Sequence, residues 1–115
     1  MTVNEAINLA TQACSASVER DKLLKHLNGI EARIGRELLK TDIPVITEGD
    51  GERVLTAPSA YAGLYPAYLM MMRELECADS DRYSFYSEVF GAAYDRYAAW
   101  ISRSSMLPCV SLKLL

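Results

Sequence analysis

The tyrosine-rich stretch at residues 59–108 constrains the fold more than any other feature of the chain, because its apolar side chains recur at helical spacing. Spacings of three and four residues bring side chains onto one face of an α-helix. Small and polar residues at 77–81 divide the stretch in two. The short connection predicts two helices packed as an antiparallel hairpin. The recurring residues are Tyr61, Leu64, Tyr65, Tyr68, Met72, Leu75, Tyr86, Phe90, Ala93, Tyr94, Tyr97, Trp100 and Ile101.

Proline and capping signals predict where these two helices begin and end. Pro58 suits the first turn of the earlier helix, which we expect to run to about Ala78. Asp79 or Ser80 is a suitable N-cap for the later helix, which we expect to run to about Ser104. The following segment is apolar and contains a helix stopper, Pro108. We therefore predict a single helical domain over residues 1–104 and an apolar C-terminal tail over residues 105–115.

Two further helices are expected nearer the N-terminus. Thr2 and Glu5 match a capping box, so a short helix should begin there, with apolar residues at Val3, Ile7, Ala10 and Cys14. Ser17 is a suitable N-cap for a second helix over about 18–39. Gly29 and Gly35 lie inside this helix and indicate close approach of another backbone, or else a distortion. The expected buried stripe of the second helix is Leu23, Leu27, Ile30, Ile34 and Leu38.

Residues 41–58 differ in character from the helices around them. They contain two prolines and two glycines, with a turn-like run at 48–52. Short β-prone runs at 44–47 and 53–56 flank this turn, so a small hairpin is one possibility. We favour an ordered surface loop, since a two-stranded hairpin needs support from other elements. The predicted fold is therefore an all-α bundle of about four helices, with a loop or small β-hairpin at 41–58.

Composition limits the classes of function. The chain has 115 residues, half of them hydrophobic, with a net charge of −3, which fits one globular domain and gives no basic footprint for phosphate backbones. No basic and apolar leader and no apolar run of membrane-spanning length occur, so we expect a cytosolic location by default. The three cysteines are scattered and fit reduced thiols.

Catalytic and metal-binding patterns are not found in the sequence. His26 is the only histidine, and its place beside the apolar stripe fits a boundary residue more than a catalyst. Glu48, Asp50 and Glu52 lack the ligand pattern of a calcium loop. We predict no enzyme activity, no metal and no cofactor.

Aromatic and methionine residues exceed what one buried stripe requires. Tyr83 and Phe85 lie off the main line of the last helix, and Met70, Met71 and Met72 should not all face one core. Alternating tyrosine and arginine could stack on nucleic acid, but the acidic balance favours core packing with arginines at the rim. Surplus tyrosine, tryptophan, methionine and arginine also indicate a protein–protein contact surface, which we prefer.

The order of these motifs resembles a family of small head-tail connector proteins from tailed phages and prophages of Gram-positive bacteria. The segment APSAYAGLYPAYL at 57–69 resembles the family element P-Y-x-x-L-Y-x-x-Y-L. DRY at 81–83, followed by FGAAY at 90–94, resembles D-R-Y-N…F-N-A-A-Y, and RSSMLP at 103–108 resembles the ending R-x-x-M-P. The segments 3–6 and 24–34 resemble the family's early helix, W-L-x-x-L-D-G-R-I, with His26 at the tryptophan position.

The resemblance implies a structural role in the virion. Such proteins are mostly helical and assemble as a homo-oligomeric ring of about 12 copies beneath the portal protein, extending the DNA channel toward the next connector or tail protein. Their location is the head-tail interface of the virion, and the bacterial host cytoplasm during assembly. DNA passes through the channel without sequence-specific binding, and no membrane is involved. The candidate core or interface residues are Tyr61, Tyr65, Tyr68, Met71, Tyr83, Phe90, Tyr94, Tyr97, Trp100 and Met106.

Other interpretations stay open at this level. A small cytosolic helical binding module, chaperone-like or regulator-like, could use the same tyrosine and methionine surface for one partner. A stable monomer or dimer would favour this module, whereas neighbouring genes for a portal, a capsid protein and a terminase would favour the connector. The tail at 105–115 either is disordered, packs on its own core, or docks on a neighbouring subunit or the portal.

Overall fold

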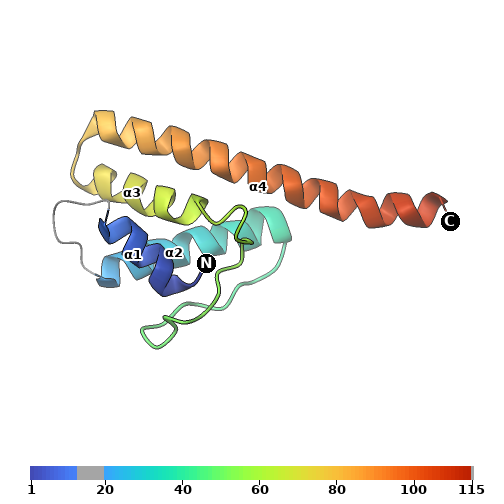
Figure 1. Cartoon of the computed structure of the whole chain (residues 1–115), viewed down its shortest axis with the longest axis horizontal. Helices are drawn as coiled ribbons and strands as arrows, with labels where there is room; N and C mark the ends of the chain where they lie inside the picture. Colours follow the sequence, from blue (N-terminus) through green and yellow to red (C-terminus); the bar gives the residue numbers. More distant parts are fainter. Residues whose placement is uncertain (13–19, 115) are drawn as a thin grey trace.

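The chain folds as an all-α bundle, which confirms the predicted class. The computed structural model describes residues 1–12 and 20–114, with side chains described as far as Ser104. These residues form α1 (Val3–Gln12), α2 (Arg20–Ile34), a π-helical turn η1 (Gly35–Leu39), α3 (Leu64–Glu76) and α4 (Ser80–Leu114). Figure 1 shows α3 lying between α4 on one side and the α1 and α2 pair on the other.

The central position of α3 explains its burial on several faces. Met70 and Met71 are both buried and Met72 is half-buried. Our expectation that the three methionines could not all pack was therefore wrong, because α3 contacts helices on both of its sides. The predicted antiparallel hairpin of α3 and α4 is confirmed, and it forms the largest helix contact of the described chain.

Capping fixes the start of α1 as predicted. The backbone amide of Glu5 donates to Oγ1 of Thr2 (3.2 Å), and the amide of Thr2 donates to Oε1 of Glu5 (3.1 Å). Val3, Ile7 and Ala10 are buried from this helix. Cys14 and the predicted cap at Ser17 lie outside the described residues.

The second helix buries the stripe that the sequence predicts as far as Ile34, but its last turn has π-helical geometry. Leu23, Leu27, Ile30 and Ile34 are buried, and the helix changes to π geometry at Gly35. A Cβ atom at Gly35 would lie 2.5 Å from the carbonyl oxygen of Thr41. Both the distortion and the close backbone approach therefore occur at Gly35. At Gly29 the nearest atom to such a Cβ is the hydroxyl of Tyr68, at 3.7 Å, so the approach predicted there is wrong.

The third helix begins at Leu64, six residues after the predicted start at Pro58. Residues 58–63 form consecutive turns, in which the amide of Tyr61 donates to the carbonyl of Pro58 (2.8 Å). A helix from Pro58 would place Pro66 in its interior, where the proline ring clashes with the preceding turn. Starting at Leu64 puts Pro66 in the first turn, where no amide donor is needed.

The fourth helix is capped as predicted but is longer than expected. Oδ1 of Asp79 accepts from the amide of Arg82 at 3.1 Å. The helix continues through Pro108 to Leu114, so the expected end near Ser104 was wrong. An internal proline costs about 3 kcal/mol in a helix, and the helix-favouring methionine and leucines around Pro108 offset part of this cost.

Residues 41–58 form an ordered loop, as we favoured over a hairpin, and the loop continues through turns to residue 63. The two β-prone runs do not pair with each other; instead Val54 forms an isolated antiparallel bridge with Thr2. The side chain of Asn28 on α2 holds the loop like a strand partner, accepting from the amide of Ile46 (2.6 Å) and donating to its carbonyl (3.0 Å). The N-terminus and α2 thus provide the support that a lone hairpin would lack.

Candidate assembly surface

Aromatic rings fill the contact between α3 and α4. The ring centroid of Tyr61 lies 5.4 Å from Trp100 and 5.8 Å from Tyr97. Nearer the turn, Phe90 lies 5.1 Å from Tyr68 and 5.5 Å from Tyr94. Tilted ring pairs at these separations add stabilisation beyond their buried area. The tyrosine periodicity of the sequence is therefore used mainly inside the hairpin.

A second cluster links α4 to the end of α2. The guanidinium of Arg33 lies 4.5 Å from the ring centroid of Tyr94, and its Nε donates to Glu37 (3.1 Å). The hydroxyl of Tyr94 donates to the same carboxylate oxygen at 2.8 Å. Burial and this hydrogen bond raise the pKa of Tyr94 to about 12, and the two donors lower the pKa of Glu37.

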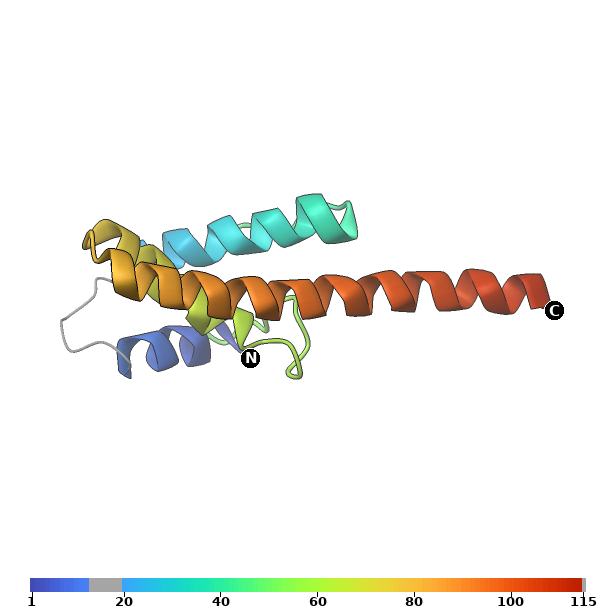
Figure 2. The same cartoon turned by 90° about the horizontal axis from the view of Figure 1, so that it is seen from above.

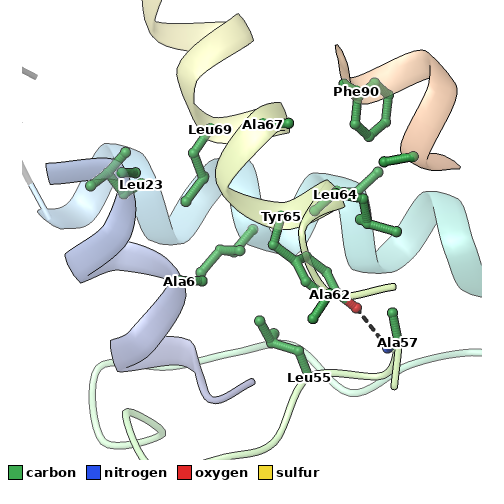
Figure 3. Close-up of a cluster of buried hydrophobic side chains, with 14 of the residues drawn as sticks. Ala6, Leu23, Leu55, Ala57, Ala62, Leu64, Tyr65, Ala67, Leu69 and Phe90 are labelled. Atoms are coloured by element: carbon green, nitrogen blue, oxygen red, sulfur yellow. Dashed lines mark hydrogen bonds between the residues drawn. The ribbon is translucent and has the colours of Figure 1, made fainter. Parts of the chain in front are cut away.

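The most buried polar cluster is centred on Glu31, which is 2% exposed. Its carboxylate accepts from the hydroxyl of Tyr65 (2.5 Å), the hydroxyl of Thr56 (2.6 Å) and the amide of Thr56 (3.2 Å). The Tyr65 hydroxyl also accepts from the amide of Ala57 at 2.9 Å, the dashed line of Figure 3. Burial and the Glu31 charge strongly raise the pKa of Tyr65. This cluster fastens the loop to α2 and α3.

A third polar cluster stabilises the turn between α3 and α4. Glu74 is buried, and its carboxylate oxygen lies 2.9 Å from Arg73 and 3.2 Å from Arg82. At the same end, Nε2 of the half-buried His26 lies 2.8 Å from Oε1 of Glu76. His26 therefore occupies a boundary position between α2 and α3, as its sequence position predicts.

Several large apolar side chains are exposed. Phe85 (60%) and Val89 (43%) project from α4 and Leu9 (45%) from α1, while Val45 (72%) and Val54 (68%) project from the loop. Leu75 near the end of α3 and Leu39 at the end of η1 are also exposed. Contiguous exposed apolar patches often mark contact surfaces. We take the exposed residues on α1 and α4, together with those on the loop, as the candidate assembly surface.

The α1–α4 side also contains a shallow groove of about 260 Å³. We call it the apolar groove. Nearly all of its lining side chains are apolar, and the exposed Leu9 and Val89 stand at its edges. The lining residues are Leu9, Gly63, Pro66, Ala67, Met70, Tyr86 and Val89.

A larger open depression of about 750 Å³ lies at the end of α2. Arg36, Lys40, Thr41 and Asp42 line it, together with Ala32 and Ile43. Lys40 has a left-handed backbone (φ 57°), and this conformation ends the π-helical turn. Because its lining contains both basic and acidic side chains, this depression has no clear preference for an anionic or a cationic ligand.

The predicted site residues divide between core and boundary. Tyr65, Met71, Phe90, Tyr94 and Tyr97 are buried. Tyr61, Tyr68, Tyr83 and Trp100 are half-buried and pack against the core, and the side chain of Met106 lies outside the described part. Four exposed residues were not among the predicted site residues: Leu9, Val45, Val54 and Val89. The signal that could have found them is that each is an apolar residue outside the predicted buried stripes. Glu31 and Glu74 were also missed.

In comparisons with known proteins, no family model, curated protein or solved structure matches the chain. Among the described residues, no three potential metal ligands of the His, Cys, Asp and Glu types come together. None of the helices in the described ranges combines the length and apolar character needed to cross a membrane.

Proposed function

We propose that this chain is a structural head-tail connector, assembled as a ring beneath the portal of a tailed-phage capsid. The ring extends the DNA channel and joins the capsid to the next connector or tail protein. The chain acts at the neck of the virion, after assembly in the host cytoplasm, and makes no covalent change to a substrate.

The observation that carries this proposal is that large apolar side chains are exposed both on α4 and on the loop. Phe85 and Val89 lie on α4, whereas Val45 and Val54 lie on the loop. A ring needs a heterologous interface, in which one patch of a subunit meets a different patch of its neighbour. Exposed apolar side chains on two separate elements of one subunit fit that requirement.

The packing of the motif residues agrees with the family resemblance. Leu64, Tyr65 and Leu69 come from the first motif and Phe90 and Tyr94 from the second, and all five are buried. The resemblance therefore falls on residues that build the core around α3. The net charge of −3 also suits a conduit through which DNA slides without being gripped.

Negative-stain microscopy of the chain mixed with its cognate portal protein tests the proposal. We expect portal rings that gain an extra layer of density on one end. Portal particles that stay unchanged at high concentrations of the chain would contradict it.

A helical binding module is the second candidate, because the apolar groove could hold a few side chains of one partner. Such a module would form a compact one-to-one complex and would leave the portal unchanged. The same microscopy experiment, combined with light scattering of the free chain, separates the two functions.

A further inference from the structure

The last part of α4 projects from the body of the molecule. Figures 1 and 2 show residues 101–114, here called the C-terminal arm, extending past all other elements. With 35 residues, α4 is about 52 Å long at 1.5 Å per residue, whereas the 13 residues of α3 span about 20 Å. The partner helix of the hairpin therefore cannot cover the arm.

The apolar line of α4 continues along this arm. Ala93 is buried and Trp100 is half-buried, and both face the core. Leu107 and Leu114 follow at the same spacing of seven residues, which keeps positions on nearly one side of a helix. Beyond Ile101, which still packs against the core, the sequence of the arm thus repeats the spacing of the core-facing positions Ala93 and Trp100.

The apolar groove cannot receive the arm of its own molecule. Tyr86 and Val89 in the groove belong to the same continuous helix as the arm. Val89 and Leu107 are 18 residues apart in α4, which corresponds to about 27 Å along the helix axis. Since a continuous helix cannot fold back on itself, an arm in this groove must come from a second copy.

Charge also favours this pairing. The chain has 12 basic and 15 acidic residues; Arg103 and Lys113 lie in segment 101–115, which has no acidic residue. The other 100 residues therefore carry a net charge of −5. Near the groove, α1 contains Glu5 and no basic residue, and the exposed Glu88 adjoins Val89, while the guanidinium of Arg82 interacts with the groove residue Tyr86. The basic arm is therefore complementary to the net negative charge of the rest of the chain.

We propose that the C-terminal arm of one copy binds in the apolar groove of the next copy. The contact joins two different surfaces, so its repetition produces a ring when the rotation closes. This inference rests on the proposed connector function and names its subunit interface.

Disulfide trapping tests the contact directly. In a full-length background with Cys14, Cys77 and Cys109 replaced by serine, one chain carries Val89→Cys and another carries Leu107→Cys. We expect the mixture to form a mixed disulfide dimer about tenfold faster than either chain alone, because binding raises the local thiol concentration. The matched control replaces Val89→Cys by Asp95→Cys, an exposed position about 120° around α4 from Val89.

Equal rates for Val89→Cys and Asp95→Cys would overturn the inference, as would trapping only between identical chains. Preferential trapping of Leu107→Cys on the portal protein would also overturn it, because the arm would then bind another partner. Trapping of Val89→Cys with Leu107→Cys in the mixture supports it.

Microscopy of wild type and Leu107→Asp with the portal separates this inference from the proposed function. Rings from wild type that are lost in Leu107→Asp, with unchanged thermal unfolding, support both. Rings from both proteins overturn the arm contact and leave the connector function intact. A trapped mixed dimer without any ring supports the arm contact and contradicts the connector function.

Discussion

The hydroxyl of Tyr65 donates a 2.5 Å hydrogen bond to Oε1 of Glu31 between two fully packed helices. The same hydroxyl accepts from the amide of Ala57, while Thr56 donates twice to the other carboxylate oxygen. One buried carboxylate and one phenol therefore hold the loop, α2 and α3 together. Loss of either group should loosen the loop first.

Replacing Tyr65 by phenylalanine should lower the free energy of unfolding by about 2 kcal/mol, because a hydrogen bond to a buried charge is lost and the amide of Ala57 is left without its acceptor. Urea denaturation followed by circular dichroism measures the change. Tyr68→Phe is the matched control, since it removes a hydroxyl from a half-buried ring; we expect a loss below about 0.5 kcal/mol. Equal losses in both variants would contradict a special role for the Glu31 contact.

Trp100→Ala should cost about 2 kcal/mol in the free subunit, because it removes a half-buried ring that contacts Tyr61 and Tyr97. Phe85→Ala is the contrasting variant: its ring is 60% exposed, so we expect less than about 0.5 kcal/mol. Circular dichroism is the suitable probe, since Trp100 is the only tryptophan. A cost below about 0.5 kcal/mol for Trp100→Ala would place this residue on an assembly surface.

The sequence was sufficient for features that depend on neighbouring residues. The spacing of Leu23, Leu27 and Ile30 predicted the buried face of α2, and the side chains of Thr2 and Asp79 predicted the caps that the structure contains. Each of these signals lies within a few residues of its effect. Helical periodicity and capping are local, so a single sequence is enough to find them.

Features that depend on distant residues could not be predicted in this way. Val54 pairs with Thr2 across the chain, and Glu31 finds its donors 25 and 34 residues away. A buried glutamate has the same local pattern as an exposed one, because burial depends on which elements pack over it. The sequence also did not predict that α4 continues past Pro108, because a proline normally ends a helix.

Gly35→Ala should destabilise the protein by about 2 kcal/mol, because the new Cβ would lie 2.5 Å from the carbonyl of Thr41 and the backbone would have to move. Gly29→Ala is the matched control, with no contact closer than 3.7 Å in an exposed helix interior. Alanine should stabilise the helix there by about 0.5 to 1 kcal/mol. Chemical denaturation of both variants checks these opposite signs, and a stabilising Gly35→Ala would contradict the close approach.

Tyr94→Phe should reduce the loss of stability at alkaline pH. The pKa of Tyr94 is about 12 in the folded state, raised by burial and by the hydrogen bond to Glu37, against about 10 in the unfolded chain. A raised pKa means that the neutral phenol stabilises the fold below about pH 10, and that this contribution is lost as the pH rises toward the folded value. Tyr65, Tyr68 and Tyr97 also have raised pKa values. Their contributions to the pH dependence of stability are retained in Tyr94→Phe.

Unfolding free energies measured by urea denaturation from about pH 8 to about pH 11 check this dependence. We expect wild type to be more stable than Tyr94→Phe at the lower pH, and the difference to narrow as the pH rises above about 10. Glu37→Gln tests the cause, because it keeps the phenol and removes the charge that accepts its hydrogen bond. The pKa of Tyr94 should then fall toward its ordinary value, and tyrosinate absorbance should develop at lower pH. A constant difference between wild type and Tyr94→Phe across this range would show that Tyr94 titrates alike in both states.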